Sequence, residues 1–124
     1  MKTAAVIARV LMGLLFLFSS ITYFFELITP PPLTGAMKTF NDGLEASVYL
    51  LPTAKLVELL CGVAFVVGRF VPLATVLISP IIVNIVLIHV FLAPEGLLVA
   101  LFLVIANALL AFRFREAYRP LLKP

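Results

Sequence analysis

Four long apolar runs dominate this sequence, and each is close to the roughly 20 residues that an α-helix needs to cross a bilayer. They cover about residues 3–28, 49–67, 71–92 and 96–112. Because lipid offers no hydrogen-bond partners to a peptide backbone, a spanning segment must be a helix or part of a closed β-barrel. The runs lack the alternation of polar and apolar residues that barrel strands show. The sequence therefore predicts an all-α fold, with residues 1–124 forming a single four-helix transmembrane domain.

The composition supports a membrane protein and excludes several functions. Of the 124 residues, 64% are hydrophobic and 12% are charged, whereas soluble domains are about half apolar and a quarter charged. The net charge of +3 does not indicate a nucleic-acid partner, because the basic residues lie at the ends of the apolar runs. A single cysteine excludes an intramolecular disulfide, and one His with one Cys is too few ligands for a metal site.

The segments between the runs predict where the helices end. The first run is longer than a signal-peptide core, so we expect a retained helix, which Pro30, Pro31 and Pro32 should end. Residues 37–47 mix polar and apolar side chains, which predicts a short amphipathic helix at the interface between the first two spans. Residues 113–119 are basic and aromatic, as in an interfacial anchor.

The positions of the basic residues predict the orientation. Membrane proteins place Lys and Arg mainly in their cytoplasmic segments. Apart from Lys55 inside the second span, one basic residue, Lys38, lies in the first loop, and seven lie near the two ends of the chain or in the second loop: Lys2, Arg9, Arg69, Arg113, Arg115, Arg119 and Lys123. Both termini are therefore expected to face the cytoplasm, in agreement with an even number of spans.

Small and polar residues form one stripe on each of two predicted helices. The first helix carries Arg9, Gly13, Phe16, Ser20 and Tyr23 on a single face, at alternating spacings of four and three. The last helix carries Gly96, Ala100, Asn107 and Ala111 in the same way. Small residues allow helices to approach closely within a membrane, so both stripes are expected at helix contacts.

Ionisable side chains inside spans are costly and are therefore candidates for function. Lys55 and Glu58 are three residues apart, which allows an ion pair within their helix. The helical rise of 1.5 Å per residue places both, with Glu26 and His89, at a similar depth in the outer half of the membrane. Asn84 and Asn107 come out nearer the midplane.

Two interpretations of these residues stay open. In the structural one, Lys55 and Glu58 snorkel to the interface and the asparagines join helices. In the functional one, the residues form a polar pocket for a lipid-soluble redox ligand or a head group. Its candidate catalytic residues are Glu58 and His89, and its candidate ligand-binding residues are Lys55, Glu58, Asn84, His89 and Asn107.

Several segments resemble the DoxX/DoxD-like family of small four-helix membrane proteins. They are Arg9–Phe16, Lys55 with Glu58 and Gly62, Gly68-Arg69 with Pro72-Leu73-Ala74, and Pro80–Leu92, in which Asn84 and His89 stand five apart after a proline. Ser20 and Tyr23 depart from the pattern, since a Gly and then a Lys are expected there. A function that depends on a lysine in the first helix is therefore not implied.

The resemblance implies a multi-pass protein of the bacterial inner membrane, in contact with its lipids. The family takes its name from a membrane subunit of a thiosulfate:quinone oxidoreductase, which makes a quinone a candidate ligand and a redox protein a candidate partner. No cofactor is evident in the sequence, and whether the chain is an enzyme stays open. The alternative is a non-catalytic scaffold or anchor that assembles with itself, as a homo-oligomer, or with a redox partner through the small-residue stripes.

Overall fold

The computed structural model describes residues 2–27 and 32–123, whose regular structure is helical throughout. The helices are α1 (Lys2–Phe25), α2 (Gly35–Ala46), α3 (Leu50–Val67), α4 (Val71–Phe91), the 3₁₀ helix η1 (Pro94–Gly96), α5 (Leu97–Arg113) and α6 (Arg115–Leu122). Four of them are long and apolar enough to cross a membrane, namely α1, α3, α4 and η1 with α5. The predicted all-α fold with four spans is confirmed.

The observed helix ends differ slightly from the predicted ones. The spans α3, α4 and α5 agree with prediction to within one residue at each end. However, α1 ends at Phe25 instead of Ile28, because Glu26 has a φ of 52°. This left-handed conformation cannot continue a right-handed helix. Ile28, Pro30 and Pro31 lie outside the described residues. Most of the proline segment that was predicted to end the first helix therefore lies outside them too.

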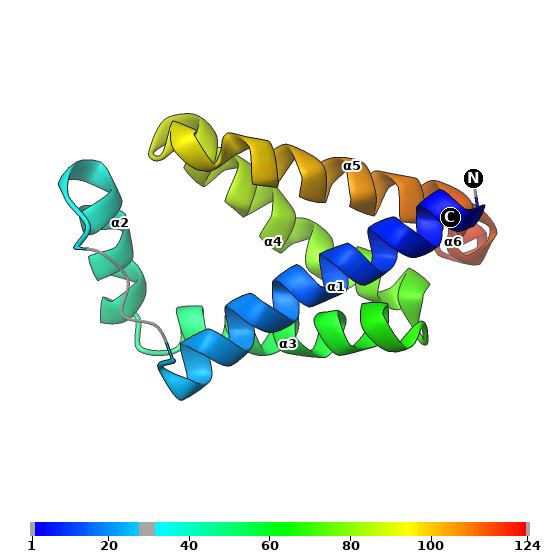
Figure 1. Cartoon of the computed structure of the whole chain (residues 1–124), viewed down its shortest axis with the longest axis horizontal. Helices are drawn as coiled ribbons and strands as arrows, with labels where there is room; N and C mark the ends of the chain where they lie inside the picture. Colours follow the sequence, from blue (N-terminus) through cyan, green and yellow to red (C-terminus); the bar gives the residue numbers. More distant parts are fainter. Residues whose placement is uncertain (1, 28–31, 124) are drawn as a thin grey trace.

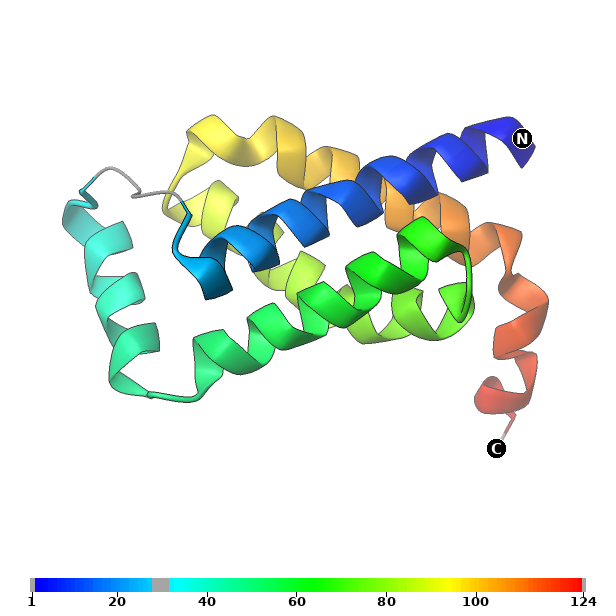
Figure 2. The same cartoon turned by 60° about the horizontal axis from the view of Figure 1, so that its bottom comes forward.

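The spans pack as two helix pairs, with α1 against α3 and α4 against α5. Both termini lie at one end of the bundle, hereafter the termini end, and α2 stands at the opposite end, hereafter the α2 end (Figures 1 and 2). In Figure 1 the two pairs separate toward the α2 end.

The contact between α1 and α3 depends on two glycines. A Cβ atom added at Gly13 would lie 2.8 Å from Val66 Cγ2 and 3.0 Å from the Gly62 carbonyl oxygen. A Cβ at Gly62 would lie 3.1 Å from the Gly13 carbonyl oxygen. Phe16 and Ser20, from the same stripe as Gly13, are buried. The stripe predicted on the first helix is thus confirmed as a helix contact, and its partner is α3 of the same chain.

The termini end is densely packed and held by polar contacts. Met12, Phe65, Ile78 and Leu110 are almost completely buried there, one from each spanning helix. Arg9 Nη1 of α1 donates a hydrogen bond of 2.6 Å to the carbonyl oxygen of Phe65 in the last turn of α3. Such a bond satisfies one of the carbonyl groups that a helix leaves unpaired at its C-terminus.

The C-terminal segment that was predicted as an interfacial anchor forms the short helix α6. The hydroxyl groups of Tyr118 on α6 and Thr75 on α4 are hydrogen bonded to each other. Thr75 Oγ1 also donates to the carbonyl oxygen of Pro72, at 2.7 Å. This contact fastens α6 to the termini end of the bundle.

A candidate ligand cavity at the α2 end

A cavity of about 670 Å³ lies at the α2 end, between the α1/α3 pair and the α4/α5 pair. Its volume is within the range of roughly 300–1,000 Å³ that is usual for small-molecule sites. The wall is largely apolar, with side chains from all four spans and from α2. Four polar or charged residues predicted as ligand-binding candidates line it: Lys55, Glu58, Asn84 and His89. The structure therefore brings these four candidates into one space.

The ion pair predicted within the second span is present. Lys55 Nζ lies 3.5 Å from Glu58 Oε2, because positions i and i+3 share a helix face. Lys55 Nζ also donates a hydrogen bond of 2.6 Å to Ser19 Oγ of α1. The Glu58 side chain is only 8% exposed, against 19% for Lys55. Lys55 thus links Glu58 of its own helix to Ser19 of α1.

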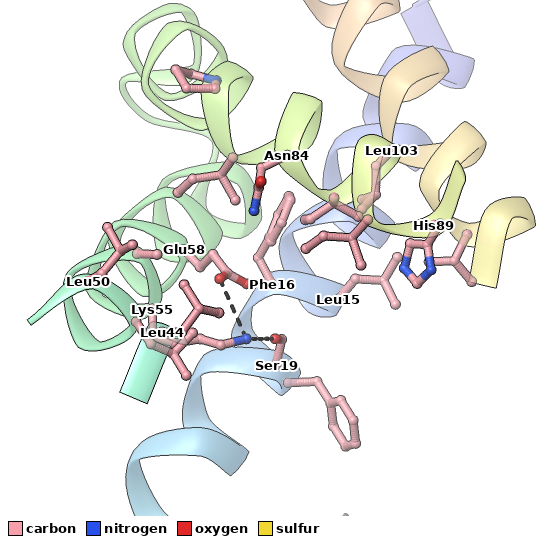
Figure 3. A pocket seen from close by; sticks show the side chains of 18 of the residues that line it. Leu15, Phe16, Ser19, Leu44, Leu50, Lys55, Glu58, Asn84, His89 and Leu103 are labelled. Carbon is pink, nitrogen blue, oxygen red and sulfur yellow. Dashed lines mark hydrogen bonds and ion pairs between the residues drawn. The ribbon is translucent and has the colours of Figure 1, made fainter. Parts of the chain in front are cut away.

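The other two polar groups come from α4. Asn84 is exposed to the cavity, and Figure 3 shows its amide directed toward the side where Glu58 and Lys55 lie. His89 lies further along α4 and points into the space beside Leu15 (Figure 3). Its ring nitrogen Nδ1 lies 2.9 Å from the carbonyl oxygen of Ala93. Glu58 and His89 therefore line the same cavity from two helices.

A glycine leaves the space that His89 occupies. A Cβ atom added at Gly96 would collide with the imidazole ring, most severely with Cε1 and also with Nδ1 at 2.5 Å. Gly96 was predicted as part of a stripe at helix contacts, and it does contact α4 here, through the imidazole ring of His89. Together, Gly96 and the Ala93 carbonyl fix the position of His89.

Helix α2 contributes to the wall of the cavity. Phe40 and Leu44, four residues apart on one helix face, both line it. Lys38 and Asp42 form an exposed ion pair of 2.8 Å. The Asp42 carboxylate beside it raises the pKa of Lys38 above its ordinary value. The amphipathic pattern predicted for residues 37–47 is thus expressed as an apolar face toward the cavity and a charged face outside it.

Two polar residues that the sequence grouped with the cavity lie elsewhere. Asn107 Nδ2 donates a hydrogen bond of 3.1 Å to Ser79 Oγ and a longer one of 3.4 Å to the carbonyl oxygen of Thr75. Asn107 therefore joins α5 to α4, as the structural interpretation expected of an asparagine. Glu26 follows the end of α1, is exposed, and does not line the cavity.

Most of the lining residues were not predicted from the sequence, and Ser19, Phe40 and Leu44 are three examples. Ser19 stands next to Ser20 of the predicted stripe but outside that face, so the helical spacing gave no sign of its contact with Lys55. Phe40 and Leu44 were recognised as apolar residues of an interfacial helix, but not as part of a site. The amphipathic pattern of residues 37–47 could have indicated that Phe40 and Leu44 line a site, because the apolar face of a helix beside a bundle can pack against that bundle.

The sequence model of the DoxX family matches residues 4–93, which is more than half of the chain. The chain belongs to the DoxX family. The match includes α1, α2, α3 and α4 and with them all four polar residues of the cavity, whereas α5 and α6 lie beyond it. Family and helices together make this a multi-pass membrane protein of the DoxX family. Comparison with curated proteins and with solved structures gives no match.

Proposed function

We propose that this DoxX-family protein binds the polar head of a membrane-soluble ligand, a quinone or a lipid, in the cavity at the α2 end. One observation carries the proposal. Lys55, Glu58, Asn84 and His89 meet in a single cavity whose wall is otherwise largely apolar. Polar groups inside a membrane protein are expensive and usually mark a ligand or proton path. A polar head fits among these four side chains, and an apolar tail fits against the remaining wall.

In this proposal each of the four side chains has a role. Glu58 and His89 accept or release protons at the ligand head, since carboxylate and imidazole are the groups that do so near neutral pH. Lys55 keeps the charge of Glu58 in place through their 3.5 Å contact. Asn84 orients the head by hydrogen bonding.

The proposed setting is a redox system of the bacterial inner membrane. Carboxylates, imidazoles, amines and amides carry no electrons, so a quinone would need a partner protein to exchange electrons with it. With both termini in the cytoplasm, as the basic residues predict, the cavity opens in the outer half of the membrane. The protein would then be a membrane subunit that holds the ligand while a partner supplies or accepts electrons.

The alternative function is a non-catalytic scaffold that assembles through its small-residue stripes. Gly13 and Gly62 are already in contact with each other between α1 and α3. A stripe that is used inside the bundle cannot also hold a second protein. The cavity is therefore the better supported of the two functions.

Native mass spectrometry on protein purified with its native lipids tests the proposal. Wild type is compared with the double variant Glu58→Gln, His89→Gln and with Asn107→Leu, which removes a membrane amide outside the cavity. We expect wild type and Asn107→Leu to carry one defined quinone or lipid, and the folded double variant to lose it. Equal amounts of bulk lipid on all three proteins would refute the cavity as a ligand site and favour the scaffold.

A further inference from the structure

The tautomer of His89 is set by its surroundings. Nδ1 lies 2.9 Å from the Ala93 carbonyl oxygen, and a carbonyl oxygen can only accept a hydrogen bond. In the neutral imidazole Nδ1 must therefore carry the proton. The carbonyl group is itself held, because the Ala93 N–H donates to the Ile88 carbonyl oxygen at 3.0 Å. Gly96, packed against the ring, restricts its rotation further.

This tautomer leaves Nε2 with a free lone pair. Within residues 2–27 and 32–123, no group hydrogen bonds to Nε2 of His89. Glu58 is paired with Lys55 at 3.5 Å, and Lys55 Nζ also donates a hydrogen bond of 2.6 Å to Ser19 Oγ. His89 Nε2 therefore offers an acceptor to a ligand head, while the amide of Asn84 and the third N–H of Lys55 offer donors.

We infer that the cavity selects a ligand head with a hydroxyl group that donates a hydrogen bond to His89 Nε2. The inference rests on the proposed function and specifies its ligand. A quinol has two such hydroxyl groups, whereas a carbonyl oxygen of a quinone can only accept and would face the lone pair of His89 Nε2. The site thus binds the reduced, hydroxyl-bearing form of a quinone in preference to the oxidised form.

The tautomer can be observed directly, because His89 is the single histidine of the chain. Protein labelled with ¹⁵N-histidine and purified without a histidine tag gives one pair of ring nitrogen signals. At about pH 8.5, where histidine side chains are ordinarily neutral, we expect the proton on Nδ1 and none on Nε2. A proton on Nε2 would overturn the inference before any ligand is added.

The selectivity is tested with three probes that share one ring and one decyl tail: a hydroquinone, its dimethyl ether and the benzoquinone. Binding is measured without oxygen at about pH 8.5 by native mass spectrometry. We expect the hydroquinone to bind about tenfold more tightly than the ether, as one buried hydrogen bond allows, and the quinone no better than the ether. In His89→Phe the advantage of the hydroquinone should disappear.

A second variant keeps the imidazole and moves it. Gly96→Ala should reduce the selectivity, because the added Cβ collides with the ring, while Gly43→Ala, with no heavy atom within 4 Å of its Cβ, should leave it unchanged. Short-chain phosphatidylglycerol added as a competitor distinguishes a quinol hydroxyl from a lipid hydroxyl as the natural donor. Equal binding of all three probes would overturn the donor preference and leave the cavity proposal standing. Binding of none would overturn both.

Discussion

The pair formed by Lys55 and Glu58 gives the sharpest test of how the cavity wall is stabilised. At the observed separation of 3.5 Å, two unit charges attract by about 5 kcal/mol in an effective dielectric of about 20. Much of this attraction offsets the cost of removing the charges from water. Lys55→Met keeps the volume of the side chain and leaves the buried carboxylate without its counter-charge. We expect a loss of about 3 kcal/mol in unfolding free energy, as for other buried ion pairs.

Removing the carboxylate should cost less. In Glu58→Gln the more exposed Lys55 can reach water along its own flexible side chain, so we expect a loss of about 1 kcal/mol. The double variant Lys55→Met, Glu58→Gln contains no buried charge, and we expect it within about 1 kcal/mol of wild type. The coupling energy of the cycle is then between about 3 and about 5 kcal/mol.

The cycle is measured by SDS-induced unfolding in mixed micelles, followed by far-ultraviolet circular dichroism. All four proteins are compared under the same conditions, and the unfolding free energies are taken from the midpoints and slopes. If the losses of the two single variants sum to the loss of the double variant within about 0.5 kcal/mol, the reasoning is refuted. That result would mean that water or lipid head groups, and not the partner side chain, compensate each charge.

Three further predictions concern the packing of the bundle. Gly13→Ala should destabilise the folded protein by roughly 1–3 kcal/mol, because the added Cβ overlaps α3. Gly43→Ala, at an open position of α2, should be neutral or slightly stabilising. Thermal unfolding of the two variants would show the difference. Gly68→Ala should destabilise because its φ is +85° and its Cβ would lie 2.5 Å from the guanidinium of Arg9, and a stability equal to wild type would contradict this. Tyr118→Phe should release α6, seen as faster amide exchange in α6 alone with ligand binding unchanged; unchanged exchange would contradict the proposed fastening of α6.

The fold was predictable because its signals are local. Apolar length identified the four spans, and the spacing of Gly13, Phe16 and Ser20 identified a buried face. The ion pair of Lys55 and Glu58 was also predictable, since both side chains lie on one turn of one helix. Each of these features depends on helical periodicity within a single segment.

The cavity was not predictable to the same degree, because it depends on how the helices rotate and separate. The sequence placed Asn84 and Asn107 both near the midplane. In the structure Asn84 faces the cavity, whereas Asn107 bonds to Ser79, which lies more than one turn of α4 closer to the termini end. Depth follows from the rise per residue, whereas the direction of a side chain relative to another helix follows from tertiary packing. The role of Gly96 beside His89 was hidden for the same reason.

Photo-crosslinking from two positions on α4 tests the central claim most directly. A benzoylphenylalanine at Ile85 faces the cavity, and one at Val83, which is 58% exposed and does not line it, serves as the control. After irradiation in native membranes, the captured species are identified by mass spectrometry. We predict that Ile85 captures one defined amphiphile that is enriched over the membrane lipids, while Val83 captures the bulk lipid mixture. The same lipid mixture at both positions would contradict the existence of a selective ligand site.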